Sequence, residues 1–254
     1  MNFLSNALGY IFTAAQWTGS SGLGMRIGEH LEYTALAVLA AVVIAVPLGL
    51  FIGHTGRGIF LVVSAVNALR ALPTLGVLLL GVLLWGLGLV PPTVALLLLG
   101  VPPLLAGTYS GIANVDRTVV EAARAMGMTE RQVLFGVEVP NALPLILSGL
   151  RTATLQVVAT ATVAAYASLG GLGRYLIDGI KVRQFHLALV GAIMVTALAL
   201  LLDAMLALAV WLSAPGTGRL RPVPDLPDRE GHAVYADSGV SAGAMPRSPG
   251  QPGR

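Results

Sequence analysis

The sequence predicts an all-α membrane protein with about five transmembrane helices. Hydrophobic residues make up 56% of the 254 positions and charged residues only 11%, a balance that is unusual for a water-soluble domain. Several apolar runs reach the roughly 20 residues that a helix needs to cross a bilayer. The chain has no cysteine, which excludes disulfides, thiolate metal sites and a cysteine nucleophile.

Residues 1–28 are expected to form an N-terminal segment that lies on the membrane surface. The stretch Met1–Met25 carries no charge, whereas a secretory signal normally begins with positive charge. Within it, Phe3–Trp17 is apolar and contains four aromatic residues. This composition favours an interfacial helix, and a sixth crossing by residues 3–17 is the alternative.

Two spans are expected in the first half of the transmembrane domain, which we place at residues 29–213. The first is Tyr33–Ile52, twenty residues without a charge. The second is Ile59–Val90, in which Arg70 is the only charged residue. The short polar run His54–Gly58 is the expected turn between them.

Three further apolar runs complete the predicted set of spans. The pair Pro91-Pro92 predicts a turn before the third span, and Pro102-Pro103 is expected to break that span internally. The fifth span contains a single acid, Asp203. The three runs are Thr93–Tyr109, Thr152–Leu169 and Leu187–Ser213.

Residues 214–254 are expected to be a disordered tail, because their Pro, Gly, Ser and Arg content cannot bury enough apolar area to fold.

Basic residues near the ends of the spans predict the orientation of the chain in the membrane. If the polar segment after the third span is cytoplasmic, that side holds six basic residues and the other side four. This bias agrees with an outside N-terminus and a cytoplasmic C-terminus. The six are Arg57, Arg117, Arg124, Arg131, Arg219 and Arg221; the four are Arg26, Arg174, Lys181 and Arg183.

The one long polar interruption, residues 111–140, is where function is expected. Asp116 can cap a helix that runs from Arg117 to about Met126, and Gly127 can end that helix in a left-handed conformation. The run Thr129-Glu130-Arg131-Gln132 fits a capping box at the start of a second helix. The sequence therefore predicts two short helices joined at a glycine.

The second helix is expected to end at Pro140. The pair of helices should form a small knob, whose acidic and basic side chains nearly cancel. This charge balance favours a docking element for a protein over a nucleic-acid interface. An ordinary amphipathic loop is the alternative interpretation. The apolar side chains that the knob should expose are Val120, Ala123, Met126 and Met128.

The spacing of Glu121-Ala122-Ala123, Gly127 and Val139-Pro140 resembles the EAA loop of ABC importer permeases. In that family the loop sits in a groove of the cytoplasmic ATPase subunit and transmits its closure to the spans. The resemblance implies a MetI-like ABC permease fold with a cytoplasmic two-helix coupling loop. It assigns the contact with the ATPase to Glu121, Ala122, Ala123, Gly127, Met128, Val139 and Pro140.

Further motifs resemble the glycine betaine, carnitine and choline permeases of osmoprotectant importers. The resemblance extends from about Glu29 to Trp211 and implies an inner-membrane permease for a quaternary amine. Methionine and phosphonate importers share the fold and a similar Arg-x-x-Pro element, so a permease for another small solute such as methionine is an alternative. The motifs are Arg70–Leu75, Tyr109–Ile112, Asn141–Pro144, Gly149–Thr154 and Gly170–Gly173.

The resemblance also implies the partners. The chain has no Gly-x-x-x-x-Gly-Lys-Ser/Thr stretch, so it is not expected to be an enzyme or to bind a cofactor, and separate ATPase subunits would use the ATP. A second permease chain would complete the pathway as a homodimer or heterodimer. Gly170, Gly171 and Gly173 would form an extracytoplasmic gate loop facing a substrate-binding protein. An ion-driven secondary transporter is the runner-up, although Asp203 is the only acid in any span.

Arg70, Arg151 and Asp203 are the ionisable residues in or beside the spans. Such residues are costly in lipid and usually face the protein interior or a wet cavity. We therefore expect Arg70 or Arg151 to pair with Asp203, and extension to the lipid headgroups is the alternative for Arg151. Few aromatic residues occur in the spans to hold a quaternary ammonium, so selectivity is expected mainly in the binding protein. The histidines, His30, His54, His186 and His232, lack metal-ligand spacing and should be interfacial or solvated.

Overall fold

The computed structural model describes residues 3–213, and this part of the chain is helical almost throughout. Four of its helices are long and apolar enough to cross a bilayer, or five crossings result if one bent pair counts as a span. The predicted all-α membrane fold is therefore confirmed, while the predicted tail lies outside the described residues. The elements are α1 (Phe3–Phe12), η1 (Ala14–Trp17), α2 (Leu23–Thr55), α3 (Ile59–Ala71), α4 (Thr74–Trp85), α5 (Val90–Ala113), α6 (Arg117–Ala125), α7 (Glu130–Val133), the π-helical turn η2 (Leu134–Glu138), α8 (Val139–Thr160), the 3₁₀ helix η3 (Ala161–Ala167), α9 (Gly173–Lys181) and α10 (Phe185–Ser213).

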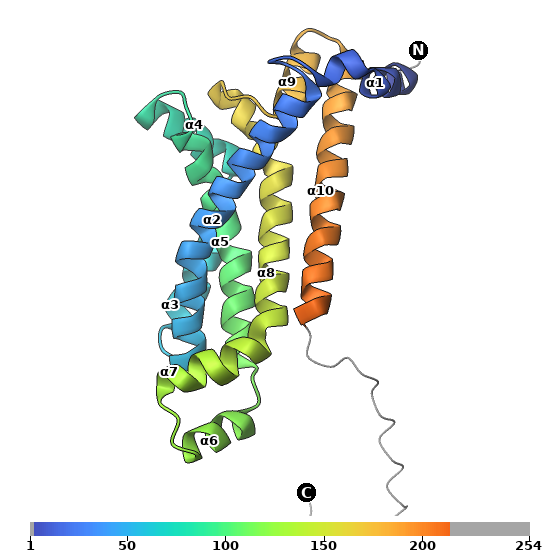
Figure 1. Cartoon of the computed structure of the whole chain (residues 1–254). Coiled ribbons are helices and arrows are strands. Elements are labelled where there is room, and N and C mark those ends of the chain that lie inside the picture. The colour runs from blue at the N-terminus through green and yellow to red at the C-terminus, as the bar shows by residue number, and fades with distance from the viewer. Residues whose placement is uncertain (1–2, 214–254) are drawn as a thin grey trace, which may run out of the picture. The chain divides into compact units, whose positions relative to one another are not determined.

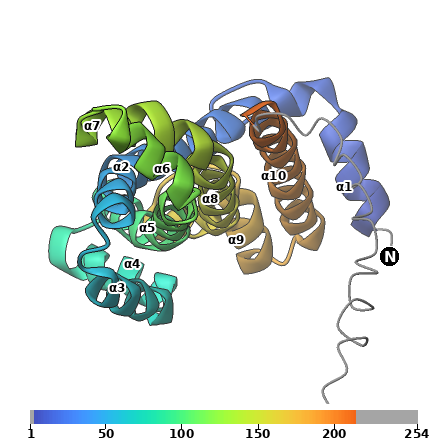
Figure 2. The same ribbon diagram turned by 90° about the horizontal axis from the view of Figure 1, so that it is seen from below.

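Helices α2, α5 and α8 form the centre of the bundle, with α5 packed against both of the others. Helix α10 packs on α8, and the α3–α4 pair packs on α5 (Figure 1, Figure 2). The short helices gather at the two ends: α6 and α7 at one end, α1 and α9 at the other. We refer to these as the α6 end and the α9 end.

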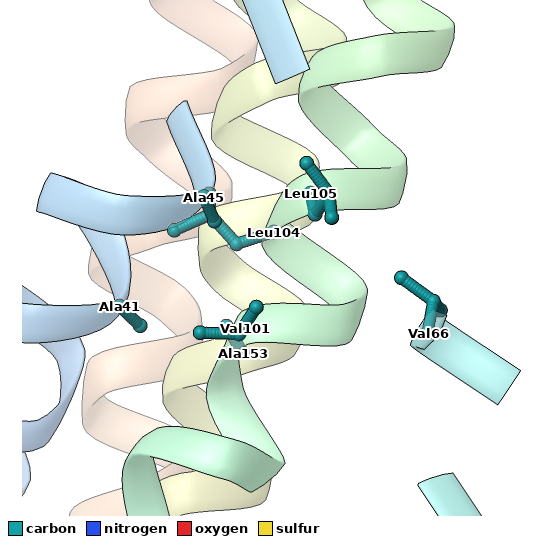
Figure 3. Packing of buried hydrophobic residues seen from close by; sticks show 7 residues of the cluster. All are labelled: Ala41, Ala45, Val66, Val101, Leu104, Leu105 and Ala153. Carbon is teal, nitrogen blue, oxygen red and sulfur yellow. The ribbon is translucent and has the colours of Figure 1, made fainter. Parts of the chain in front are cut away.

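The central helices approach closely because small residues lie where they cross. Gly107 of α5 faces Gly149 of α8, and a Cβ atom at Gly107 would lie 2.7 Å from the Gly149 Cα. Gly49 and Gly53 of α2 contact Thr108 and Ile112 of α5 in the same way. Small residues at such positions let helix backbones pack in lipid, where the hydrophobic effect gives no drive for association. The neighbouring core cluster joins α2, α3, α5 and α8 (Figure 3) and consists of Ala41, Ala45, Val66, Val101, Leu104, Leu105 and Ala153.

The predicted span Ile59–Val90 is not one helix. It is divided into α3 and α4, which meet at an angle of 85°. Leu72, the residue before Pro73, is extended, with φ −73° and ψ 128°, because a proline disfavours helical conformation in the residue that precedes it. The segment is therefore not the single continuous helix that was expected, although the bent pair can still count as one broken span.

The prolines of α5 also differ from expectation. Pro91 and Pro92 do not form a turn but occupy the first turn of α5, where the missing amide hydrogen would have had no helical acceptor. Pro102 and Pro103 do not end the helix, which runs unbroken to Ala113. Both are buried against neighbouring helices, the setting in which membrane helices tolerate proline.

Helix α1 has only ten residues, about half of the roughly 20 that a crossing needs. It packs against the first turns of α10, where the Phe3 and Phe185 rings meet edge to face at 6.1 Å. The length of α1 thus favours the interfacial interpretation of this segment over a sixth crossing.

Candidate functional site

Residues 116–138 form a compact unit at the α6 end, composed of α6, α7 and η2, which we call the α6–α7 unit (Figure 1). The residues that begin and end its short helices have the roles predicted from the sequence. Asp116 caps α6, since its Oδ1 accepts a 2.8 Å hydrogen bond from the Thr118 amide. Gly127 is left-handed at φ +85°. The Thr129 amide donates to Gln132 Oε1 at 2.8 Å as part of a capping box.

Some apolar side chains of the unit point into its interior and others point to the surface, a division that the sequence did not reveal. Val120, Ala123 and Val133 are buried against one another, and Met128 packs beside them. The expected exposure of Val120 and Ala123 was therefore wrong, because α6 folds back onto the segment that follows it. Ala123 is only 2% exposed, so it holds the unit together and is not free to contact another protein.

A different row of residues forms the outer face of α6. Val119, Ala122 and Met126 are exposed, and their spacing of three and four residues places them on one side of the helix. Met126 is 77% exposed. We call these three residues the outer stripe. Of the apolar contact residues that the EAA resemblance implied in α6, Ala122 lies on this surface and Ala123 does not.

An ion pair crosses the turn at Gly127. The Arg124 guanidinium donates two hydrogen bonds, of 3.0 and 2.9 Å, to the two carboxylate oxygens of Glu130. These bonds to Glu130 raise the pKa of Arg124, so the guanidinium remains charged. A two-point bond of this kind fixes orientation as well as distance, and here it sets how α6 lies against α7.

Pro140 does not end the second helix, contrary to the prediction. The chain continues from α7 through η2 into α8, with Val139 half-buried and Pro140 exposed in the first turn of α8. Proline lacks the amide hydrogen of a normal helical bond, and the preceding residues are wound as a π turn, a common local adjustment at functional sites. The helix runs across the α6 end and then turns into the bundle (Figure 1). Any displacement of the α6–α7 unit is thus continuous with α8.

His54 ties this unit to the end of α2. Its Nδ1 lies 2.6 Å from Glu138 Oε2, and its Nε2 lies 3.1 Å from Glu130 Oε2. Glu138 is only 5% exposed, so His54 is the partner that makes burial of this carboxylate tolerable. His54 was expected to be interfacial or solvated; it is half-buried in the last turn of α2, and the sequence did not reveal its partner, which is 84 residues away.

Replacing His54 with alanine should loosen the α6–α7 unit. The Glu138 carboxylate would lose its partner while buried, and a buried polar group left without its partner costs about 1–3 kcal/mol. We expect a lower melting temperature in detergent and faster tryptic cleavage in the unit. His186→Ala is the matched control, because His186 has no hydrogen bond or ion pair within residues 3–213. Equal behaviour of the two variants would contradict the anchoring role of His54.

A hollow of about 430 Å³ separates the ends of α2 and α5 from α6. Its charged lining includes Arg117, Glu121, Arg124 and Glu138, together with His54. Glu121, the acidic residue of the EAA motif, therefore borders this hollow. The α6 end thus carries an apolar stripe on the outer side of α6 and a charged recess on the side of α6 that faces α2 and α5.

Of the three ionisable residues expected in or beside the spans, two form a pair and one is unpaired. Arg151 Nε and Nη2 donate to Asp203 Oδ1 and Oδ2 at 2.5 and 2.7 Å, which joins α8 to α10. Arg70 lies elsewhere, exposed, and has no hydrogen bond or ion pair in the described part of the chain. The expected pair is thus formed by Arg151, and the alternative pairing of Arg70 with Asp203 was wrong.

Reversing the charge at either member of this pair should impair folding, because the remaining charge would face a like charge in the membrane. Arg151→Asp and Asp203→Arg are each expected to give little monodisperse protein on size exclusion. The double variant restores opposite charges and should recover a substantial part of the yield. A double variant no better than the singles would show that the bundle does not depend on this pair.

The predicted gate-loop glycines lie against the first turns of α2 at the α9 end. The Gly171 amide donates to Glu29 Oε2 at 2.6 Å, and the Arg26 guanidinium donates to the same oxygen at 2.9 Å. Gly171 is left-handed at φ +80°, and a Cβ at Gly170 would collide with the Glu29 carboxylate. Arg26 and Glu29 thus fasten the loop to α2, a contact that the sequence analysis missed.

His30 and Gly173 make further close contacts around the loop at Gly170 and Gly171. His30 is fully buried, with Nε2 3.0 Å from the Val158 carbonyl oxygen and Nδ1 without a partner. The expectation of an interfacial His30 was therefore wrong. Gly173 packs so closely on the backbone of Thr162 that a Cβ would collide with its carbonyl oxygen. The loop is thus tightly packed against α2 and η3.

Comparison with known proteins agrees with this architecture. The family model described as "Binding-protein-dependent transport system inner membrane component" matches residues 45–210. The chain is 37% identical over 190 residues to the glycine betaine/carnitine/choline transport system permease protein of Bacillus subtilis (strain 168), covering 75% of this chain and 88% of the relative. It is 34% identical over 175 residues to the carnitine transport permease protein of Listeria monocytogenes, covering 69% and 80%.

Solved structures show the same fold. A chain of the MetNI methionine ABC transporter in an inward-facing conformation superimposes with a TM-score of 0.65 at 21% identity, covering 75% of this chain and 95% of that chain. A chain of an amino acid ABC transporter crystallised with histidines gives a TM-score of 0.56 at 22% identity, covering 74% and 91%. At this level of identity the likeness concerns the fold alone.

Proposed function

Since this chain belongs to the family of binding-protein-dependent transport system inner membrane components, we propose that it is the permease subunit of an ATP-driven importer for quaternary-amine osmoprotectants such as glycine betaine, choline or carnitine. The observation that carries the solute class is the 37% identity over 190 residues to a glycine betaine/carnitine/choline permease. The methionine alternative has less support, because the methionine transporter chain is only 21% identical. A secondary transporter has no support of comparable weight.

The α6–α7 unit is the proposed contact with a separate cytoplasmic ATPase subunit. The outer stripe offers an apolar surface with a small residue, Ala122, at its centre, which suits insertion into a groove. The His54–Glu138 contact and the continuity of α7, η2 and α8 connect this surface to the spans. ATP would be used by that partner, and this chain would bind no cofactor.

The proposed orientation follows from this contact. With the α6 end in the cytoplasm, the start of α2 and the loop at Gly170, Gly171 and Gly173 face outward, where a substrate-binding protein would dock. The N-terminus then lies outside and the C-terminus inside. A chain of up to five crossings needs a second permease chain, identical or similar, to enclose a solute path.

The test is reconstitution. The chain should be purified together with candidate ATPase subunits, inserted into lipid nanodiscs and assayed for ATP hydrolysis with the binding protein and each of the three solutes. We expect the ATPase to copurify and its rate to rise when the binding protein carries its solute. Failure to recruit any ATPase would contradict the permease assignment. Recruitment without stimulation by any of the three solutes would contradict only the solute class.

A further inference from the structure

A second hollow, with a volume of about 370 Å³, lies where the broken α3–α4 pair meets α5 and α8. This volume is sufficient for a small solute. Most of its wall is apolar, with leucines from α3 and α5 and the Pro102-Pro103 pair. Four polar side chains lie among these apolar groups: Arg70, Thr74, Thr152 and Gln156.

The hollow lies near the middle of the bundle. At about 1.5 Å per residue, Arg70 is roughly 16 Å along α3 from Ile59. Pro102 is a similar distance, also roughly 16 Å, from the end of α5 at Ala113, and Thr152 is roughly 20 Å along α8 from Val139. A hydrocarbon core is about 30 Å thick, so all three helices bring these residues to its central part. Binding sites of transporters occur at this depth, often beside discontinuous helices.

Arg70 is the charged group of this hollow and has no partner within residues 3–213. An arginine at membrane depth is costly unless something offsets its charge, and Asp203, the acid of α10, is already bound to Arg151. The break at Leu72-Pro73 adds to the positive character, because α4 starts at Thr74 without a side-chain cap and its first amides lack helical acceptors. The hollow is therefore suited to a negatively charged group.

We propose that this hollow binds the carboxylate of the transported solute through Arg70, and that the permease itself therefore favours carboxylate-bearing quaternary amines, such as glycine betaine and carnitine, over choline. The inference rests on the proposed import function. Choline has a quaternary ammonium but no carboxylate, so Arg70 would repel it without compensation. The described residues that line the hollow include no aromatic side chain, so the hollow offers no cation–π site for the ammonium.

This arrangement assigns different roles to the lining residues. Arg70 supplies the charge-assisted hydrogen bonds, and Gln156, which is exposed, can donate a further bond. The Thr152 hydroxyl donates to the Ser148 carbonyl at 3.0 Å and so retains only its acceptor capacity. The leucines and prolines provide an apolar surface for the methyl groups of the solute. Selectivity would then lie partly in this chain and not only in the binding protein.

The absence of cysteine from the sequence makes a charge-restoration experiment possible. Arg70→Cys introduces the single thiol of this chain, and the full complex with its ATPase and binding protein is then reconstituted in proteoliposomes. We expect uptake of glycine betaine and carnitine to fall about tenfold or more, as for loss of a hydrogen bond to a charged group. Choline uptake should fall much less. Treatment with aminoethyl methanethiosulfonate, which restores a positive charge, should recover betaine uptake, whereas the negatively charged sulfonatoethyl reagent should not.

Protection of the thiol gives a second readout. Glycine betaine should slow modification of Arg70→Cys, and choline at the same concentration should not. The wild-type complex, treated identically, controls for thiols of the partners. Leu80→Cys is the matched variant, because Leu80 is an exposed residue of α4 outside the hollow; it should transport normally and show no protection. Arg70→Lys, which keeps the charge, should retain most betaine uptake and so separates loss of charge from loss of folding.

Three results would overturn the inference: equal losses for betaine and choline, equal effects of the two reagents, or a thiol that no reagent reaches because lipid or the second permease chain covers it. Failure of the proposed solute class can be distinguished from failure of the role proposed for Arg70. If the wild-type complex imports methionine and no quaternary amine, the proposed solutes are wrong. The charge-restoration series with methionine, which also carries a carboxylate, then decides the role of Arg70.

Discussion

Replacing Ala122 with arginine should detach the proposed ATPase subunit from this permease without unfolding it. Ala122 is exposed between Val119 and Met126 on the outer stripe, and a long charged side chain there would prevent close approach of a partner. A central interface residue can contribute 2 kcal/mol or more to binding, so we expect copurified ATPase to fall about tenfold or more. Solute-stimulated ATP hydrolysis should fall with it, while the melting temperature stays near that of the wild type.

Two companion variants make this result decisive. Ala123→Arg places the same side chain one residue later, where Ala123 is buried against Val120 and Val133, and should instead destabilise the unit and speed its proteolysis. Ala15→Arg changes an exposed alanine near the opposite end of the bundle and should retain the ATPase. If Ala122→Arg retains as much ATPase as Ala15→Arg, the outer stripe is not the docking surface.

The contrast between Ala122 and Ala123 shows what the sequence could and could not predict. The cap at Asp116, the left-handed Gly127 and the capping box at Thr129 depend on residues within four positions of one another, and they were readable from the sequence. The direction in which Ala123 points depends on where α6 packs. A resemblance to a motif gives the positions of its residues but not which of them reach the surface.

Long-range contacts were beyond sequence reasoning for the same physical reason. Asp203 could have paired with Arg70 or Arg151, and only the packing of α10 on α8 selects Arg151. The partners of His54 and the clamp from Glu29 to Gly171 also join distant segments. The break at Leu72-Pro73, in contrast, had a local signal, since the residue before a proline is biased away from helix.

The small-residue contacts between helices also had a readable signal. Gly107 and Gly111 are four residues apart in α5, and Gly49 and Gly53 have the same spacing in α2. This is the pattern of closely packed membrane helices. The spacing alone does not show which helix each pair contacts, because that depends on how distant segments pack.

The Gly107–Gly149 contact predicts the second large effect, a loss of stability in Gly107→Ala. The new methyl group would lie 2.7 Å from the Gly149 Cα and 3.0 Å from the Leu145 carbonyl oxygen. Backbone atoms cannot rotate away as a flexible side chain can, so α5 and α8 must separate. Overpacking of this kind costs about 1–3 kcal/mol, although alanine is the better helix former by about 1 kcal/mol. Thermal unfolding in nanodiscs should therefore show a lower midpoint.

Gly28→Ala separates packing from helix propensity. Gly28 is in helix α2, and a Cβ there would meet nothing within 4 Å, so this variant should unfold at the same midpoint as the wild type or higher. The same movement of α5 and α8 should also disturb the Arg70 hollow, because Pro103 and Thr152, which line it, lie within four residues of Gly107 and Gly149 on these two helices. Gly107→Ala should thus weaken betaine uptake beyond its effect on the amount of folded protein. If Gly107→Ala and Gly28→Ala both raise the midpoint, α5 and α8 are not in the close contact on which that geometry depends.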